Sequence, residues 1–172
     1  ATLVRQALAA RAARAKAEKL SVSPVRPGVL WADYLVTNRG SGKTWRVAFR
    51  GWERGESYCA CADFRTNTLG TCKHLLRVAD WARRRFPAAV CRQPYRPERF
   101  AVHLRYGAQV ELRLQTPAAL APELAAVVAP VAGQPVSDVP ALLQAVRELE
   151  AREQPVTVFP DAEEYIQQRL FA

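Results

Sequence analysis

The amino-acid sequence predicts an α+β fold made of two small parts, and three observations support it. Segments in which apolar and polar residues alternate, as in half-buried strands, occur together with segments of helical period. About half of the 172 residues are hydrophobic (49%), which is enough to bury a core. Residues 1–100 hold 20 basic and 7 acidic side chains, whereas residues 101–172 hold 5 basic and 9 acidic ones. The first part is therefore strongly basic (+13), and the second is acidic (−4).

The N-terminal segment predicts a helix followed by a linker. Residues 3–20 are rich in Ala, with Leu, Arg, Lys and Glu, which are strong helix formers. Residues 21–28 contain two prolines and end in Gly28, a composition that stops a helix and is typical of connecting segments. We therefore expect residues 1–28 to form an N-terminal helix and a linker.

The next segment predicts a β-hairpin, a short strand and a helix, which together form one module over residues 29–90. Strands are expected at residues 29–38, 44–50 and 57–61, with a turn at residues 39–42. The second strand has apolar residues on one face and two arginines on the other, as a half-buried strand does. From Lys73 the apolar residues recur at helical spacing, until Pro87 ends the helix.

The last segment predicts a small, acidic α+β part over residues 99–172. A proline-marked joint at residues 90–98 separates it from the module before. Strands are expected at residues 99–106, 109–115 and 155–159, and helices at residues 118–128, 138–152 and 161–170.

Metal-binding residue types are concentrated in one short stretch. Cys59-Ala60-Cys61 is followed, after ten residues, by Cys72-Lys73-His74. In extended chain the side chains of a Cys-x-Cys pair project from the same face, and the second pair falls where the predicted helix begins, an end that favours a thiolate. Zinc prefers four thiolate or imidazole ligands in a tetrahedron. The sequence therefore predicts a closed, structural Zn2+ site with no position for a reactive water, whose ligands are Cys59, Cys61, Cys72 and His74.

Three other interpretations of these residues are weaker. A chance cluster of buried thiols is uncommon when three cysteines and a histidine fall within 16 residues. A redox pair more often has the Cys-x-x-Cys spacing. The crowding of three thiols disfavours a catalytic Cys–His pair. Cys91 exceeds the four ligands, and His103 lies in a predicted strand, so we expect both outside the site.

The pattern Cys-x-Cys, a variable gap and Cys-x-His resembles the SWIM zinc finger. The likeness extends to Tyr58 before the first pair, to Leu69-Gly70 before the second pair, and to the apolar helix that follows. It implies the strand–strand–helix unit of that family. Such fingers are generally taken to bind DNA or protein, and they occur ahead of the motor in bacterial Swi/Snf-type helicase-like ATPases, in Mutator-type transposases and in partners of recombinases. Residues 156–165 are also similar to the segment just before the motor of those ATPases.

The sequence does not predict an enzyme. Residues 40–44 (GSGKT) imitate the end of a phosphate-binding loop, but the full pattern needs Gly where Thr37 stands and a helix where a strand is predicted. A glycine-rich hairpin turn explains these residues better. We find no acidic pair that would hold magnesium for phosphoryl transfer, so we expect an accessory module whose motor lies elsewhere in the same or another chain.

The basic first part predicts a nucleic-acid partner, and DNA in particular, held through its backbone without base reading. A protein-interaction module that docks on a motor or a recombination partner is the alternative, and charge that serves solubility alone is a third interpretation. The candidate contacts are basic residues expected to form one basic face of this part: Arg39, Lys43, Arg46, Arg50, Arg54, Arg65, Lys73 and Arg77.

The sequence also favours a cytoplasmic protein that does not enter a membrane. No apolar run approaches the roughly 20 residues that span a bilayer. The first 20 residues carry basic side chains throughout, so they do not form a secretory signal. In the cytosol, cysteines are more often metal ligands or free thiols than disulfides.

Overall fold

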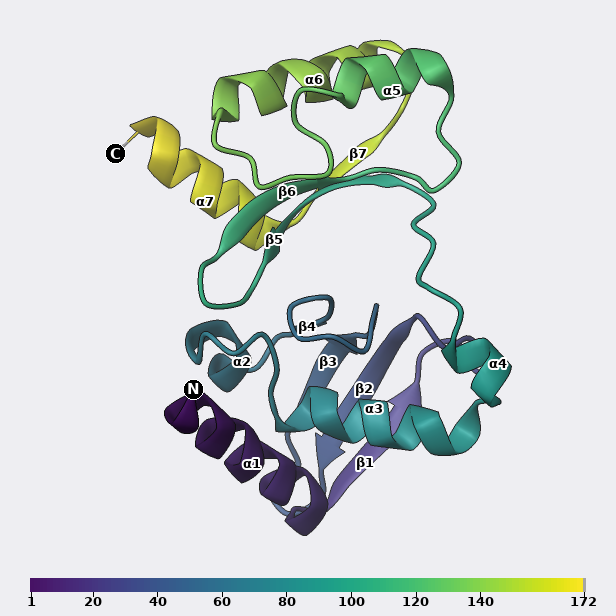
Figure 1. The fold of residues 1–172 in the computed structure, drawn as a ribbon, viewed down its shortest axis with the longest axis vertical. Helices are drawn as coiled ribbons and strands as arrows, with labels where there is room; N and C mark the ends of the chain where they lie inside the picture. The colour runs from purple at the N-terminus through teal and green to yellow at the C-terminus, as the bar shows by residue number, and fades with distance from the viewer. Residues whose placement is uncertain (172) are drawn as a thin grey trace. The chain divides into compact units, whose positions relative to one another are not determined.

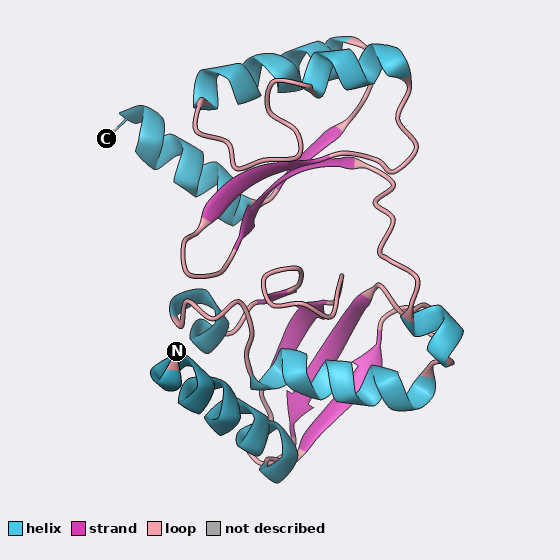
Figure 2. Cartoon of the chain, viewed as in Figure 1, coloured by secondary structure: helices cyan, strands magenta, loops and turns pink. Residues whose placement is uncertain are grey.

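The computed structural model describes residues 1–171 and confirms the α+β class (Figure 1, Figure 2). The chain forms two compact units. The first consists of Ala1–Tyr95 together with Tyr106–Gln109, and the second consists of Arg96–Arg105 and the residues from Val110 onwards. Every helix within residues 1–171 is too short or too polar to cross a lipid bilayer.

The first unit contains a four-stranded antiparallel sheet in the order β1-β2-β3-β4. Its register sets Tyr34 opposite Val47, and Val47 opposite Cys59, so these three side chains share one face. The elements are α1 (Thr2–Ala17), β1 (Leu20–Pro24), β2 (Asp33–Asn38), β3 (Thr44–Ala48), β4 (Tyr58–Cys59), α2 (Ala62–Thr66), α3 (Lys73–Arg85) and α4 (Ala88–Cys91).

One face of this sheet is buried under α3, and α1 packs against α3 in turn (Figure 1). The alternation of β2 and β3 puts Tyr34, Val36 and Val47 on that face, and all three are fully buried. On α3, Val78 and Ala82 are spaced by one helical turn and are equally buried. The predicted hairpin and the predicted helix from Lys73 are therefore confirmed. Together they bring the C-terminal end of β4 close to the N-terminal end of α3.

The prediction of a linker over residues 21–28 is wrong for its first half, because β1 pairs with β2 along its whole length. Leu20 lies opposite Asn38, and Pro24 lies opposite Tyr34. Proline lacks a backbone N–H, but β1 is an edge strand, where one of its sides needs no partner. The alternation of Leu20 and Val22 with serines was the strand signal that the prolines obscured.

Two short helices, α2 and α4, fall in segments predicted as loop or joint. A helix of four or five residues is too short to show a 3.6-residue period, so neither one has a periodic signal in the sequence. The segment after α3 is fastened to the unit by two indole N–H groups. Trp31 donates to the carbonyl of Gln93 (2.8 Å), and Trp52 donates to the carbonyl of Cys91 (2.9 Å).

The second unit contains a three-stranded sheet in the order β6-β5-β7, in which β5 is antiparallel to β6 and parallel to β7. All six predicted elements of this part are present. They are β5 (Phe100–Arg105), β6 (Glu111–Gln115), α5 (Pro122–Val128), α6 (Val139–Ala151), β7 (Val156–Val158) and α7 (Pro160–Phe171). The core is mainly aliphatic, with Leu112, Leu142 and Leu149 fully buried.

Candidate metal centre

The structure brings together the four residues that the sequence predicted as metal ligands. One ligand atom from each of Cys59, Cys61, Cys72 and His74 lies within 4.8 Å of all the others, and all four residues are buried. Cys91, which is half-buried in α4, and His103, which is half-buried in β5, lie outside this cluster. The group can therefore hold one metal ion among residues of the first unit.

Each ligand is placed by the end of an element. Cys59 closes β4 on the buried face of the sheet, opposite Val47. Cys61 is the N-cap of α2, where its sulfur accepts a hydrogen bond from the Phe64 N–H (3.4 Å). Cys72 is the N-cap of α3, and His74 lies in the first turn of that helix. Two helix N-termini, which favour negative charge, thus point at the sulfur atoms.

The loop between the two ligand pairs has a fixed shape. The Asn67 side chain donates to the carbonyl of Thr71 (2.7 Å) and accepts from the N–H of Leu69 (2.8 Å). Gly70 has a positive φ of 71°, and a Cβ there would lie 2.7 Å from the backbone nitrogen of Gly55. Only glycine fits that position, because it needs both a left-handed conformation and close backbone approach.

The spacing of the donor atoms fits a tetrahedral ion. His74 turns Nδ1 toward the cluster, 3.7 Å from the sulfur of Cys59 and 3.8 Å from the sulfur of Cys72. These separations are long for strong hydrogen bonds. A zinc ion about 2.3 Å from sulfur and about 2.0 Å from nitrogen would hold the two atoms about 3.5 Å apart. Three sulfurs and one imidazole nitrogen also form a donor set that zinc prefers.

The three sulfurs strongly perturb one another. Hydrogen bonds from the Cys59 and Cys72 thiols lower the pKa of Cys61. The bonds with Cys61 and Cys72, together with burial, raise the pKa of Cys59. The bond with Cys59 lowers the pKa of Cys72, but the bond with Cys61 and burial outweigh it and raise that pKa to about 12. The three thiols therefore do not titrate independently: the pKa of Cys61 lies below its ordinary value, and the pKa values of Cys59 and Cys72 lie above theirs.

Two ion pairs attach α1 beside the cluster. Arg11 donates twice to the Asp63 carboxylate (2.7 and 3.0 Å), and its side chain is only 14% exposed. The pKa of Arg11 is raised, chiefly by that hydrogen bond and further by the nearby charges of Cys72 and Cys61. At the other end of α1, Glu18 accepts from Lys73 (2.7 Å). The N-terminal helix is thus part of the metal centre's surroundings.

Half of the predicted nucleic-acid contacts have acidic partners. Arg46 and Arg50 lie on the outer face of β3 and its extension, as predicted, but both bind the Asp33 carboxylate, each at 2.7 Å. Lys73 pairs with Glu18, and Arg77 lies 3.9 Å from Asp80. Side chains that share one carboxylate have less net charge to offer a phosphate. The pairing depends on strand register, which the sequence did not show.

The other four candidates, Arg39, Lys43, Arg54 and Arg65, are exposed and have no ion pair within the described part of the chain. The backbone N–H of Arg39 donates to the carbonyl of Lys19 (2.9 Å), which brings a further lysine beside the β2–β3 turn. Sequence reasoning missed Lys19. The available signal was that no acidic residue occurs before Glu18, so every charged side chain within α1 is basic.

The turn between β2 and β3 is closed by its own hydrogen bonds. The Asn38 side chain accepts from the N–H groups of Gly40 (2.9 Å) and Ser41 (3.2 Å). The Gly42 N–H donates to the Asn38 carbonyl (2.7 Å), and the Lys43 N–H donates to the Ser41 hydroxyl (3.3 Å). A phosphate-binding loop offers these groups to its ligand, whereas here the chain itself uses them.

Comparison of the whole chain with known proteins assigns no family to it. Protein-family models, curated proteins and solved structures contain no match to the chain. What the chain does must therefore be argued from the geometry and the charge of its own residues.

Proposed function

We propose that this chain is a non-catalytic module whose first unit is held together by zinc and binds nucleic-acid backbone. The observation that carries the proposal is the buried Cys3His cluster at the junction of β4, α2 and α3. Its donor set and spacing favour zinc among the common metals. Four protein ligands fill a tetrahedron, so the ion would cross-link the chain and leave no position for a substrate.

Zinc would give this unit a rigidity that its small elements lack. Cys59 comes from a strand of two residues, and Cys61 caps a helix of five. Elements of this size are unstable alone. When bound, the ion joins them to α3 through Cys72 and His74, and the energy of metal binding becomes folding energy.

The charge of the first unit supports a nucleic-acid partner. Within residues 1–171, exposed cations without carboxylate partners occur on α1, at the β2–β3 turn, in the loop between β3 and β4, and on α2. Such residues attract a polyanion and pair with phosphates independently of sequence. The contacts that we assign first are Arg39, Lys43, Arg54 and Arg65.

The resemblance to SWIM zinc fingers supports a place beside a helicase-type motor. Gly70 adopts a left-handed conformation that favours glycine, and Lys73, between Cys72 and His74, pairs with Glu18 at the end of α1. Residues within the resembling motif therefore also shape the metal centre. Residues 156–165, which resemble the segment before a Swi/Snf-type motor, form β7 and the start of α7. We propose that the chain is the accessory N-terminal region of such an ATPase, with the motor in the same or another chain.

The alternative, a protein-interaction module, is favoured by one observation. Phe159, Leu170 and Phe171, near or within α7, expose 46%, 41% and 84% of their surface. Large apolar side chains exposed at both ends of one helix are available for contact with a protein partner. Docking through this part and nucleic-acid binding by the first unit are compatible with one another.

Metal analysis and oligonucleotide titrations test the proposal. We expect one zinc per chain and affinity that falls about two to three decades between 50 and 200 mM salt, as roughly four to six phosphate contacts require. Changing Arg39 and Lys43 to Glu should lower the slope of log affinity against log salt by about two. The matched control changes Arg147 and Arg152 of the acidic unit to Glu, with the same change in charge and little effect. Absence of binding at 50 mM salt would leave protein interaction as the function.

A further inference from the structure

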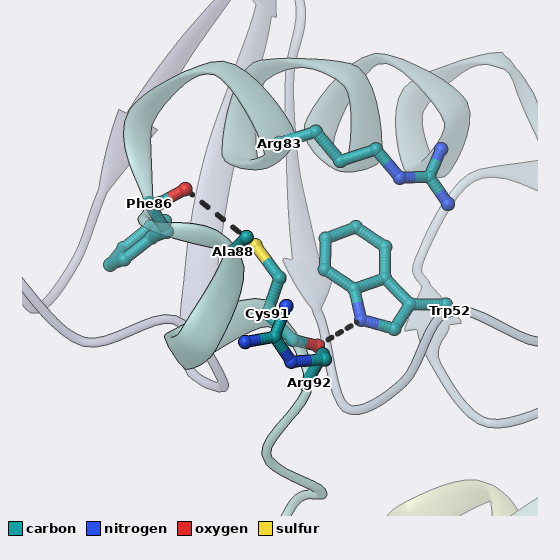
Figure 3. A pocket seen from close by; sticks show the side chains of 6 residues that line it. All are labelled: Trp52, Arg83, Phe86, Ala88, Cys91 and Arg92. Carbon is teal, nitrogen blue, oxygen red and sulfur yellow. Dashed lines mark hydrogen bonds between the residues drawn. The ribbon is translucent and has the colours of Figure 1, made fainter.

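A pocket beside the C-terminal end of α3 has features that the proposed backbone contacts do not use. Its volume is about 380 Å³, and all of its lining residues belong to the first unit (Figure 3). They come from the loop before β4, from the end of α3, and from α4 and the residue after it. The lining residues are Trp52, Arg83, Phe86, Ala88, Cys91 and Arg92.

An indole ring is fixed in this pocket with a guanidinium group over it. Trp52 packs edge-on against Trp31 and Phe49, with ring centroids 5.3 and 5.2 Å apart, and its N–H is held by Cys91. The guanidinium carbon of Arg83 lies 4.5 Å from the centroid of the Trp52 ring, a cation–π contact. Figure 3 shows the Arg83 side chain extending from α3 toward this ring. The Trp52–Arg83 pair thus brings an aromatic ring and a planar, positively charged group together before any ligand binds.

The pocket is also electropositive. Among the residues the structure describes, no Asp or Glu lines it. Arg83 and Arg92 are exposed, and neither is in an ion pair within residues 1–171. The next residue, Arg84, differs because it pairs with Asp80 at 3.1 Å. Basic residues at a helix C-terminus often serve only the helix dipole, but that role does not require Arg83 to lie on a tryptophan.

We propose that this pocket binds one unpaired base of a single-stranded nucleic acid, so that the base stacks on the Trp52–Arg83 pair and Arg92 binds a neighbouring phosphate. The inference rests on the proposed nucleic-acid function and adds to it a strand form and a site. Proteins hold single strands by combining aromatic or guanidinium planes with a basic surface. A base within a duplex is already stacked and does not offer its face. An acidic peptide would satisfy the charge but has no planar ring for the pair.

The test compares two neighbouring arginines on two kinds of single strand. Arg83→Lys keeps the charge but removes the plane, and Arg84→Lys is its matched control outside the pocket. Each full-length variant is titrated with a single-stranded oligonucleotide and with an abasic strand of equal length. We expect Arg83→Lys to weaken binding of the base-containing strand about tenfold, as loss of one stacked base does. It should leave the abasic strand unchanged, and Arg84→Lys should change neither.

Further measurements separate the pocket from the wider function. Arg92→Ala should weaken both strands to the same small extent, because it removes a phosphate contact. Equal effects of Arg83→Lys and Arg84→Lys on the base-containing strand would overturn the pocket while leaving nucleic-acid binding intact. Absence of binding to any oligonucleotide at low salt would overturn both. If polyglutamate binds as tightly and is weakened equally by Arg83→Lys, the ligand is an acidic protein segment. Zinc content equal to the parent's shows that each variant is folded.

Discussion

The two units of this chain are stabilised by different means. The second has a core of aliphatic side chains gathered by a three-stranded sheet and its helices, with Leu112, Leu142 and Leu149 wholly buried. The first has an aromatic core, in which Trp31 packs on Phe49 with ring centroids 5.1 Å apart, and a corner built from four metal-binding side chains. We therefore expect the first unit to depend on an ion bound at this cluster, where its elements are shortest, and the second unit to fold without one.

The charges follow the same division. The basic first part has a net charge of +13 over residues 1–100, and the second has −4 over residues 101–172. Repulsion among like charges opposes a compact state. In the first unit the pairs of Arg11 with Asp63 and of Lys73 with Glu18 offset part of it beside the metal centre. The cations that stabilise the metal centre are thus not the unpaired ones that we expect to attract a polyanion.

Loss of the metal should have the largest effect on stability. It should unfold part of the first unit and leave the second unit folded. Cys72→Ser, or a strong chelator, removes binding energy on the order of 10 kcal/mol from a centre that closes the sheet onto α3. We expect amide hydrogen exchange in the full chain to become fast across residues 44–86. Exchange in α6 should stay slow, because its core contains no metal ligand.

Cys91→Ser is the matched control for that experiment, since Cys91 lies outside the cluster and its sulfur only approaches the Phe86 carbonyl (3.7 Å). It should leave both the metal content and the exchange pattern unchanged. Protection of residues 44–86 that persists in Cys72→Ser without metal would show that the aromatic core is sufficient.

The reciprocal experiment weakens only the second unit. Leu142 on α6 is fully buried, and Leu142→Ala should cost about 2–5 kcal/mol through lost burial and a cavity. Hydrogen exchange in α5, α6 and β5 should accelerate while one metal ion per chain is retained. Metal loss on this substitution would mean that the two units unfold together and are not stabilised independently.

Proton release on metal binding tests the same contrast from the chemistry of the sulfurs. In the folded cluster the sulfurs already differ in proton affinity, because the pKa of Cys61 is lowered while the pKa values of Cys59 and Cys72 are raised. Binding to a folded centre at pH 7 would therefore release fewer than three protons, because the thiol with the lowered pKa has already lost its own. If the metal-free unit is unfolded, all three thiols have ordinary pKa values of about 8.5, and binding releases about three.

We expect about three protons, in agreement with metal-coupled folding, and affinity that rises as the pH increases because fewer protons must be displaced. Calorimetry in buffers of different ionisation enthalpy measures the number directly. A value of two would show that the metal-free first unit keeps its fold. The Cys91→Ser variant should release the same number as the parent.

Much of this arrangement follows from local sequence signals. The spacing of the cysteines and of His74 predicts the four residues that meet, because ligand chemistry constrains both residue type and spacing. The strand β1 was missed because Pro24 is acceptable only at an edge, and edges are a property of the assembled sheet. The helix α2 was missed because it is five residues long and its N-cap is a cysteine, Cys61, whose sulfur accepts the capping hydrogen bond.

The ion pairs could not be predicted from the sequence, because they too depend on how the strands pair in the assembled sheet. Arg46 and Arg50 were predicted on one face of a strand, and they lie there. The carboxylate that binds them comes from β2, where Asp33 stands opposite Ala48. A shift of register by one residue would have moved Asp33 to the other face. Only the three-dimensional pairing of the strands shows that this part of the basic surface is partly neutralised.

The smallest predicted effect concerns the Asp33 carboxylate, which pairs with Arg46 and Arg50. Burial alone would raise the pKa of Asp33, but hydrogen bonds from Arg50 and Arg46 outweigh it and lower the pKa, so the carboxylate is charged at neutral pH. Asp33→Asn would release both arginines toward solvent. Because Arg46 is 59% exposed, its pair contributes only about 0–1 kcal/mol to stability, so the fold should persist.

Nucleic-acid affinity should then increase, and its salt slope should become steeper by about one for each arginine that gains a phosphate. Asp80→Asn removes the same charge but frees Arg84 and Arg77 on α3 instead, so the two variants compare the outer face of β3 with the surface of α3. A steeper slope in Asp33→Asn alone would assign the outer face of β3 to the binding surface. If Asp33→Asn weakens binding, Asp33 instead holds the two arginines in the geometry that phosphates require, and the basic first unit owes its affinity to arrangement as well as to charge.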